Sequence, residues 1–156
     1  MVKLTTQQIG KCGELLIQYI LLRHGIDSAP LTTDPGIDLV AFPNMKVSPE
    51  QRRKPLTIQV KTSTHRPELS DSAGTKWIEW WISDKCLADY VAAVDLERQM
   101  CWLFRTEEFR KRGYRSGVGY RLLWYVPGHE YGKTEKKEEH FKEYEMEAAI
   151  PKVFGL

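Results

Sequence analysis

LTIQVKTS, the stretch from Leu56 to Ser63, alternates apolar and polar residues as a half-buried β-strand does. The alternation places one set of side chains on one face of the strand: Leu56, Ile58, Val60 and Thr62. Gln59 and Lys61 then lie next to each other on the opposite face. We therefore expect an amide and an ammonium group side by side on one face of a sheet.

A second strand precedes this one and carries an acidic residue. IDLVAF, residues 37–42, follows an Asp-Pro-Gly turn signal at residues 34–36 and is apolar apart from Asp38. A carboxylate in such a strand is costly to bury unless a cation accompanies it. Lys61 is a candidate for that cation. Two interpretations without function remain beside a functional site: a structural Asp38–Lys61 ion pair, and an outward polar face on an edge strand.

The N-terminal segment has the pattern of a long helix. Thr5 or Thr6 can cap it, and Gly25 is a typical stop after Arg23. Apolar residues recur at helical spacing at five positions: Ile9, Cys12, Leu16, Tyr19 and Ile20. The second half of the helix is apolar nearly all round, which predicts burial on more than one side. Glu14 lies beside this apolar surface, so its carboxylate needs a partner.

The rest of the chain reads as short strands and short helical segments. We expect extended segments at residues 27–33, 77–82, 91–96, 100–105 and 120–126, a short helix from Ser83 or Asp84 to Tyr90, and a helical turn at 106–112. The three-residue gap between 91–96 and 100–105 predicts a hairpin. Ten of the fifteen residues from Lys133 to Glu147 are charged. We therefore expect the C-terminal tail, residues 133–156, to be weakly held.

Length and composition indicate one globular domain over residues 1–156. The chain is 42% hydrophobic and 11% aromatic, which excludes disordered and collagen-like proteins. Its longest apolar stretch, residues 15–22, contains Gln18 and is far shorter than the roughly 20 residues of a membrane span. The first residues lack the apolar core of a secretory signal, so we expect a cytoplasmic protein. The three cysteines are odd in number and widely spaced, which suits neither a disulfide framework nor a zinc site.

The order of these polar residues along the chain resembles the PD-(D/E)XK nuclease superfamily. The matching phrases are IGKCGEL at residues 9–15, PGID at 35–38 and IQVKT at 58–62. The closest patterns are those of archaeal Holliday-junction resolvases and of PD-(D/E)XK homing endonucleases encoded by introns. The resemblance covers about residues 7–108. It implies an α/β fold with the restriction-endonuclease-like αβββαβ core, in which helices flank a mixed central sheet.

The same resemblance implies a site and a reaction. Asp38, Gln59 and Glu14 would bind Mg²⁺, with Mn²⁺ as an alternative metal, because hard cations prefer oxygen donors. Gln59 stands at the family's second acidic position, so this chain departs from the commonest pattern and its site carries one negative charge less. Glu14 would restore that charge. Lys61 would orient or deprotonate the attacking water and offset charge on the scissile phosphate. The expected activity is that of a magnesium-dependent DNA endonuclease.

Local basic clusters are the candidates for contacts with DNA. The net charge is only +2, so no overall positive field indicates a nucleic-acid partner. Five residues in two clusters are the predicted DNA contacts: Arg52, Arg53, Lys54, Arg112 and Arg115. For either cluster alone, a solvated surface is the simpler interpretation. A homodimer or higher homo-oligomer is expected, because one short domain contacts little duplex and cleavage of both strands needs two sites.

Two further function classes remain open. The domain can be a nucleic-acid-binding relative in which Gln59 marks a weakened or inactive metal site. It can also be a protein-interaction module in which the charged tail contacts a partner. Metal affinity separates the first from a nuclease, and deletion of the tail separates the second. All three hypotheses rest on whether Glu14, Asp38, Gln59 and Lys61 converge at one notch open to water.

Overall fold

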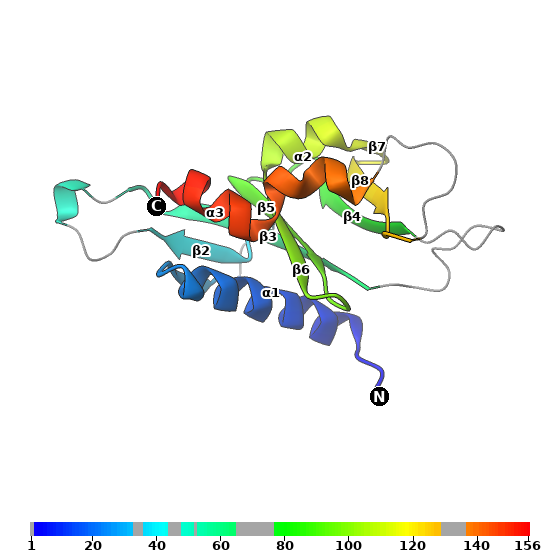
Figure 1. The fold of residues 1–156 in the computed structure, drawn as a ribbon, viewed down its shortest axis with the longest axis horizontal. Coiled ribbons are helices and arrows are strands. Elements are labelled where there is room, and N and C mark those ends of the chain that lie inside the picture. Colours follow the sequence, from blue (N-terminus) through cyan, green and yellow to red (C-terminus); the bar gives the residue numbers. More distant parts are fainter. Residues whose placement is uncertain (1, 33–35, 44–47, 52, 65–76, 129–136) are drawn as a thin grey trace.

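The computed structural model of the protein describes residues 2–32, 36–43, 48–51, 53–64, 77–128 and 137–156 (Figure 1). Three helices are present in these ranges: α1 (Thr6–Arg23), α2 (Thr106–Arg112) and α3 (Met146–Phe154). Eight strands accompany them: β1 (Asp27–Pro30), β2 (Leu39–Phe42), β3 (Leu56–Ser63), β4 (Trp77–Ser83), β5 (Tyr90–Asp95), β6 (Met100–Arg105), β7 (Tyr114–Ser116) and β8 (Gly119–Tyr125). Two 3-10 turns complete the described elements: η1 (Pro49–Gln51) and η3 (Glu138–Tyr144).

The central sheet has five strands in the order β1-β2-β3-β5-β6. β3 and β5 are parallel, and the other neighbours are antiparallel. A second, antiparallel sheet has the order β4-β8-β7. The expectation of an α/β fold with a mixed central sheet flanked by helices is therefore confirmed. In the register of β3 and β5, Gln59 lies beside Val91 and Lys61 lies beside Ala93 on the neighbouring strand.

Each face of the central sheet has its own apolar core. On one face, α1 and α3 pack on the side chains of Ile58 and Val60, with Ile17 and Ile150 fully buried in this core. On the other face, the second sheet and Phe109 of α2 pack on the sheet. Figure 1 shows α1 and α2 on opposite sides of the strands. Gln59 and Lys61 alternate with Ile58 and Val60, so they belong to the face turned away from α1.

The predicted short helix after Ser83 is absent. Residues 84–89 form turns and irregular backbone between β4 and β5. The guanidinium of Arg110 donates hydrogen bonds to the carbonyl oxygens of Asp84 and Cys86. The side chain of Asp89 accepts hydrogen bonds from both the backbone and the hydroxyl of Thr57. These carbonyl oxygens and the Asp89 carboxylate thus accept hydrogen bonds from α2 and β3 and not from within a helix, which favours an irregular segment.

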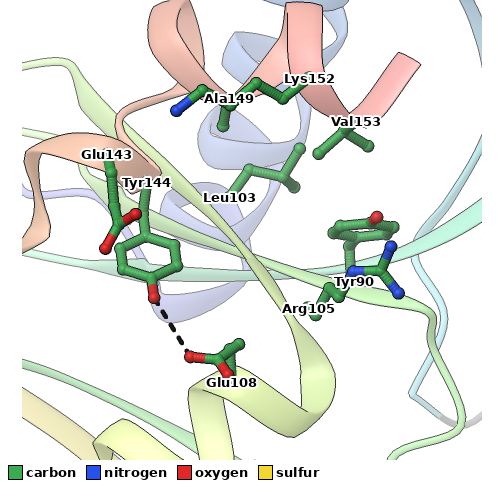
Figure 2. Close-up of a pocket in the computed structure, with 9 residues that line it drawn as sticks. All are labelled: Tyr90, Leu103, Arg105, Glu108, Glu143, Tyr144, Ala149, Lys152 and Val153. Atoms are coloured by element: carbon green, nitrogen blue, oxygen red, sulfur yellow. Dashed lines mark hydrogen bonds between the residues drawn. The ribbon is translucent and has the colours of Figure 1, made fainter. Parts of the chain in front are cut away.

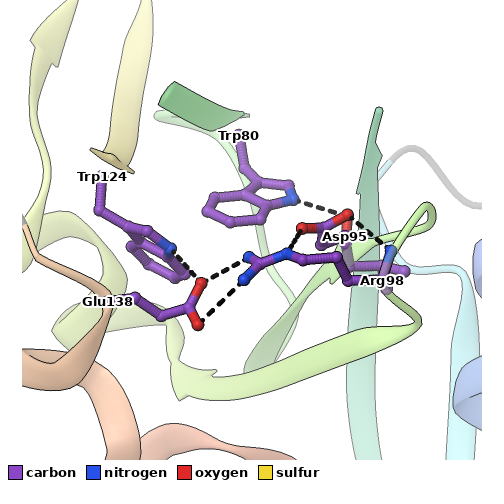
Figure 3. Close-up of polar contacts among 6 residues, drawn as sticks. Trp80, Asp95, Arg98, Trp124 and Glu138 are labelled. Carbon is purple, nitrogen blue, oxygen red and sulfur yellow. Dashed lines mark hydrogen bonds and ion pairs between the residues drawn. The ribbon is translucent and has the colours of Figure 1, made fainter. Parts of the chain in front are cut away.

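The prediction of a weakly held tail is wrong for residues 137–156, and residues 133–136 lie outside the described part of the chain. η3 and α3 pack against both cores and bury four large apolar side chains: Phe141, Met146, Ile150 and Phe154. Glu138, although charged, is 8% exposed. Its carboxylate accepts two hydrogen bonds from the guanidinium of Arg98 and one from the indole of Trp124 (Figure 3). The high charge of the tail is therefore partly neutralised inside the fold.

The described helices are also too short or too polar to cross a lipid bilayer.

Candidate functional site

Asp38 lies where β2 begins to separate from β3. Its backbone N–H donates to the carbonyl oxygen of Ile58 at 2.9 Å, one residue before the ladder of β2 starts. Its side-chain Oδ2 accepts a hydrogen bond from the N–H of Val60 at 2.6 Å. The carboxylate thus accepts a hydrogen bond from a backbone N–H of β3, that of Val60, which the short ladder between β2 and β3 leaves without a partner. This contact holds the carboxylate beside β3, at the margin of the sheet where the ladder with β2 ends.

The environment of Asp38 contains charges of both signs. Partial burial, reinforced by the negative charge of Glu14, raises the pKa of the Asp38 carboxyl above its ordinary value. The hydrogen bond from Val60 and the ammonium groups of Lys61 and Lys11 act in the opposite direction on this pKa. Burial therefore outweighs these favourable contacts in its effect on the pKa of Asp38. A bound cation would lower this pKa.

Glu14 reaches this region because α1 lies unusually close to β3. A Cβ atom added at Gly13 would lie 1.8 Å from Oγ1 of Thr62, so only glycine allows the helix to approach the strand this closely. Thr62 is the neighbour of Lys61 in β3. The side chain of Glu14 is 24% exposed, and its Oε2 lies 2.8 Å from the ammonium nitrogen of Lys11. Glu14 is therefore partly open to solvent and already paired.

Gln59 is buried with an unsatisfied oxygen. The residue is 6% exposed, and its Oε1 has no hydrogen-bond partner among the described residues. Its Nε2 is turned toward Gly36, where an added Cβ would lie 3.4 Å away. Gly36 has a φ of 94°, a backbone conformation that favours glycine. A buried carbonyl-type oxygen without a donor costs about 1–3 kcal/mol, so this oxygen is a natural ligand for a cation.

The structure brings the four predicted residues together only in part. Asp38 interacts electrostatically with both Lys61 and Glu14. Gln59 and Lys61 share a face of β3, as the alternation predicts. Glu14, however, belongs to the helix that covers the opposite face, the face of Ile58 and Val60. Asp38, at the sheet margin, is the residue that links the two sides.

These donors fit a hard divalent cation. Asp38 and Glu14 offer carboxylate oxygens and Gln59 offers an amide oxygen, which is the ligand chemistry that Mg²⁺ prefers. Within the described ranges, no three His, Cys, Asp or Glu side chains form a cluster of the kind that holds a metal. Of the three predicted ligands, only Asp38 and Glu14 are of these residue types, because Gln59 is an amide. Water would have to complete the coordination of a bound ion.

Most of the predicted DNA-contacting residues have partners inside the protein. Arg112 donates to the hydroxyl of Tyr144 and pairs with Glu108. Arg115 pairs with Asp84 at 3.0 Å, and its guanidinium lies over the ring of Tyr120. The guanidinium of Arg53 packs against Gly155 at the end of α3. Lys54 is exposed, and Arg52 lies outside the described residues.

A separate cavity lies between β6, α2 and the C-terminal elements (Figure 2). Its volume is about 290 Å³. Leu103 and Val153 line it with apolar groups, while Arg105 and Glu108 contribute charge. Glu108 accepts a hydrogen bond from the hydroxyl of Tyr144 at 3.1 Å. None of the four predicted site residues lines it, so this cavity is distinct from the Asp38 region.

Two residues of the Asp38 region, Lys11 and Gly13, were given no role from the sequence. The spacing of Lys11 and Glu14, three residues apart on one helix, could have indicated their ion pair. The close approach at Gly13 could not be foreseen, because it depends on which strand lies beneath the helix.

The chain is similar in structure to the bacterial homing endonuclease I-Ssp6803I. The match has a TM-score of 0.60 and 17% sequence identity, and it covers 97% of this chain and 92% of that protein. At this identity the likeness shows a shared fold. No known protein family matches the sequence, and no curated protein does.

Proposed function

We propose that the protein is a metal-dependent DNA endonuclease of the PD-(D/E)XK type, with Glu14, Asp38, Gln59 and Lys61 as its active site. One observation carries the proposal: the Asp38 carboxylate is held at the sheet margin by the N–H of Val60, within electrostatic reach of Lys61 and Glu14. A carboxylate and an ammonium group that can meet the same phosphate are the minimum for activating water and offsetting the charge of the transition state.

The chain's own residues divide the work. Asp38 and Gln59 would hold Mg²⁺ or Mn²⁺ through their oxygens, with Glu14 as a ligand from the α1 side. When bound, the metal supplies Lewis-acid activation of the phosphate and of a water molecule. Lys61 orients the attacking water and offsets the negative charge that grows on the scissile phosphate. The hydrogen bond from Val60 keeps Asp38 in place throughout.

The choice of DNA as substrate rests on the sequence motifs and on the fold. One solved structure with a matching fold is described as a homing endonuclease. Its fold match spans nearly the whole of both chains, which supports the choice of a nuclease for this chain. We further propose a homodimer as the working form, because cleavage of both strands of a duplex needs two sites.

The experiment is a nicking assay on supercoiled plasmid DNA with Mg²⁺ or Mn²⁺. The wild type should convert the supercoiled form to the nicked form, and Lys61→Ala should lose at least about a hundredfold in rate, as removal of one stabilising group does. Lys152→Ala, on the exposed surface of α3, is the matched control and should behave as the wild type. Nicking that survives Lys61→Ala undiminished would contradict the proposal.

A second candidate is a DNA-binding relative without catalysis. The neutral Gln59 and the presence of only two carboxylates favour it, because a site with less negative charge binds a cation more weakly. Titration calorimetry with Mn²⁺ distinguishes the two. A nuclease requires that the wild type bind Mn²⁺ and that Asp38→Ala not do so. Equal, negligible binding by both proteins would favour the inactive relative.

A further inference from the structure

Lys11 and Glu14 form an ion pair within one turn of α1. The ammonium nitrogen of Lys11 lies 2.8 Å from Oε2 of Glu14, and it donates a hydrogen bond to that oxygen. Residues three apart lie on the same side of a helix, so the pair forms without distortion of the backbone. The side chain of Lys11 is 54% exposed. The ion pair is therefore open to solvent and to any molecule that approaches the site.

The turn of α1 that carries this pair is fixed to the strand that carries Lys61. Gly13, between Lys11 and Glu14, makes the close contact with Thr62 of β3. Lys11 also acts electrostatically on Asp38, as Lys61 does. Lys11 thus gives the site a second ammonium group in addition to that of Lys61. The group of Lys11 comes from α1, and that of Lys61 comes from β3.

A metal ion at this site must compete with Lys11. The hydrogen bond from Lys11 occupies Oε2 of Glu14, one of the two carboxylate oxygens that this residue would offer to a metal. Two cations next to each other repel, so a divalent ion bound to Glu14 would drive the ammonium group away. The side chain of Lys11 is long and half in solvent, which makes this movement easy. The displaced ammonium group of Lys11 would then pair with another anion, and a DNA substrate bound at this surface would offer its phosphates.

We propose that Lys11 is a further substrate-binding residue of this site: it is the counter-ion of Glu14 before the metal binds, and it contacts a backbone phosphate of DNA once the metal occupies Glu14. This inference rests on the proposed function. It differs from the role of Lys61 in that Lys11 opposes metal binding and favours DNA binding.

The test uses Lys11→Met, which keeps the length and the apolar stem of the side chain. Lys3→Met is the matched control, because it removes the same charge from an exposed position before α1. We expect Lys11→Met to bind Mn²⁺ about two- to fivefold more tightly in titration calorimetry without DNA, the range that corresponds to an exposed ion pair. Lys3→Met should bind Mn²⁺ as the wild type does.

The second measurement is binding to a short labelled DNA duplex in Ca²⁺ at several salt concentrations. Loss of one phosphate contact should weaken binding and lower the slope of log affinity against log salt by about 0.9. Lys11→Arg keeps the charge and should keep the slope. Wild-type Mn²⁺ affinity in Lys11→Met, an unchanged slope, or equal changes in Lys3→Met would each overturn the proposal.

Asp38→Ala separates this inference from the proposed function. If Asp38→Ala loses Mn²⁺ binding while Lys11→Met matches the wild type in both measurements, the metal site stands and the role of Lys11 is wrong. If Asp38→Ala binds Mn²⁺ like the wild type, the proposed function itself fails. Thermal unfolding of each variant confirms that the comparison is between folded proteins.

Discussion

At the scale of single residues, the charge of Asp38 that the proposed metal site needs is also a cost to the stability of the folded protein. Its carboxyl is partly buried, and its pKa is raised by that burial and by Glu14. The alternation of β3 predicts that Gln59 and Lys61 share a face, because a strand has a period of two. The hydrogen bond from Val60 to Asp38 could not be predicted, since it depends on where the ladder between β2 and β3 ends.

Asp38→Asn should therefore stabilise the protein at neutral pH when divalent metals are absent. The asparagine oxygen still accepts the hydrogen bond from Val60, but the uncompensated charge is gone. Since the pKa of Asp38 is higher in the folded than in the unfolded state, the wild type loses stability as the pH rises through the folded pKa. The gain from Asp38→Asn should thus be largest near neutral pH and vanish in acid. Denaturant unfolding at several pH values measures it, and an Asn variant that is less stable at pH 7 would contradict this account.

At the scale of secondary-structure elements, α1 illustrates what a sequence pattern does and does not determine. The caps and the spacing predict its bounds well, because Thr5 forms a capping box with Gln8 and the helix ends just before Gly25. The prediction that its second half is buried on more than one side is wrong. Leu15, Tyr19 and Leu22 are each more than half exposed. Apolar composition does not say how many neighbours the fold provides.

The close packing of α1 on β3 gives a sharp prediction. Gly13→Ala should destabilise the protein by about 1–3 kcal/mol, because the new methyl group overlaps Thr62. Gly10→Ala is the control in the same helix. No atom lies within 4 Å of a Cβ at Gly10, so alanine there should be neutral or stabilising by up to about 1 kcal/mol.

A size swap tests whether the contact with Thr62 is the cause. The double variant Gly13→Ala with Thr62→Gly should recover part of the stability that Gly13→Ala loses, beyond what the two single changes predict by addition. Denaturant unfolding of the four proteins gives the coupling energy. Strict additivity would show that the cost of Gly13→Ala arises elsewhere.

At the scale of the whole molecule, the C-terminal segment connects the two sheets. Arg98, in the turn between β5 and β6, lies between the carboxylates of Asp95 and Glu138, and Glu138 also accepts from Trp124 of the second sheet (Figure 3). Burial acts to lower the pKa of Arg98, but the hydrogen bonds to these two carboxylates and their negative charges together raise it. A count of charges cannot reveal this network, since Arg98 and Glu138 are forty residues apart.

Glu138→Ala should destabilise the protein by about 3 kcal/mol, because it leaves a half-buried guanidinium and a buried indole N–H without their acceptor. Glu139→Ala is the matched control. The side chain of Glu139 is 63% exposed, so its loss should change the free energy of unfolding by less than about 0.5 kcal/mol. Equal effects of the two substitutions in thermal unfolding would show that the network does not hold the tail.

The proposed metal site requires that Asp38 and the unsatisfied oxygen of Gln59 bind the same cation. Anomalous scattering from Mn²⁺ in a crystal of the protein tests it most directly. We expect a manganese peak in contact with the Asp38 carboxylate and Oε1 of Gln59, with Lys11 moved away from Glu14. A manganese peak elsewhere, or a Gln59 oxygen turned to a donor of the protein itself, would contradict it.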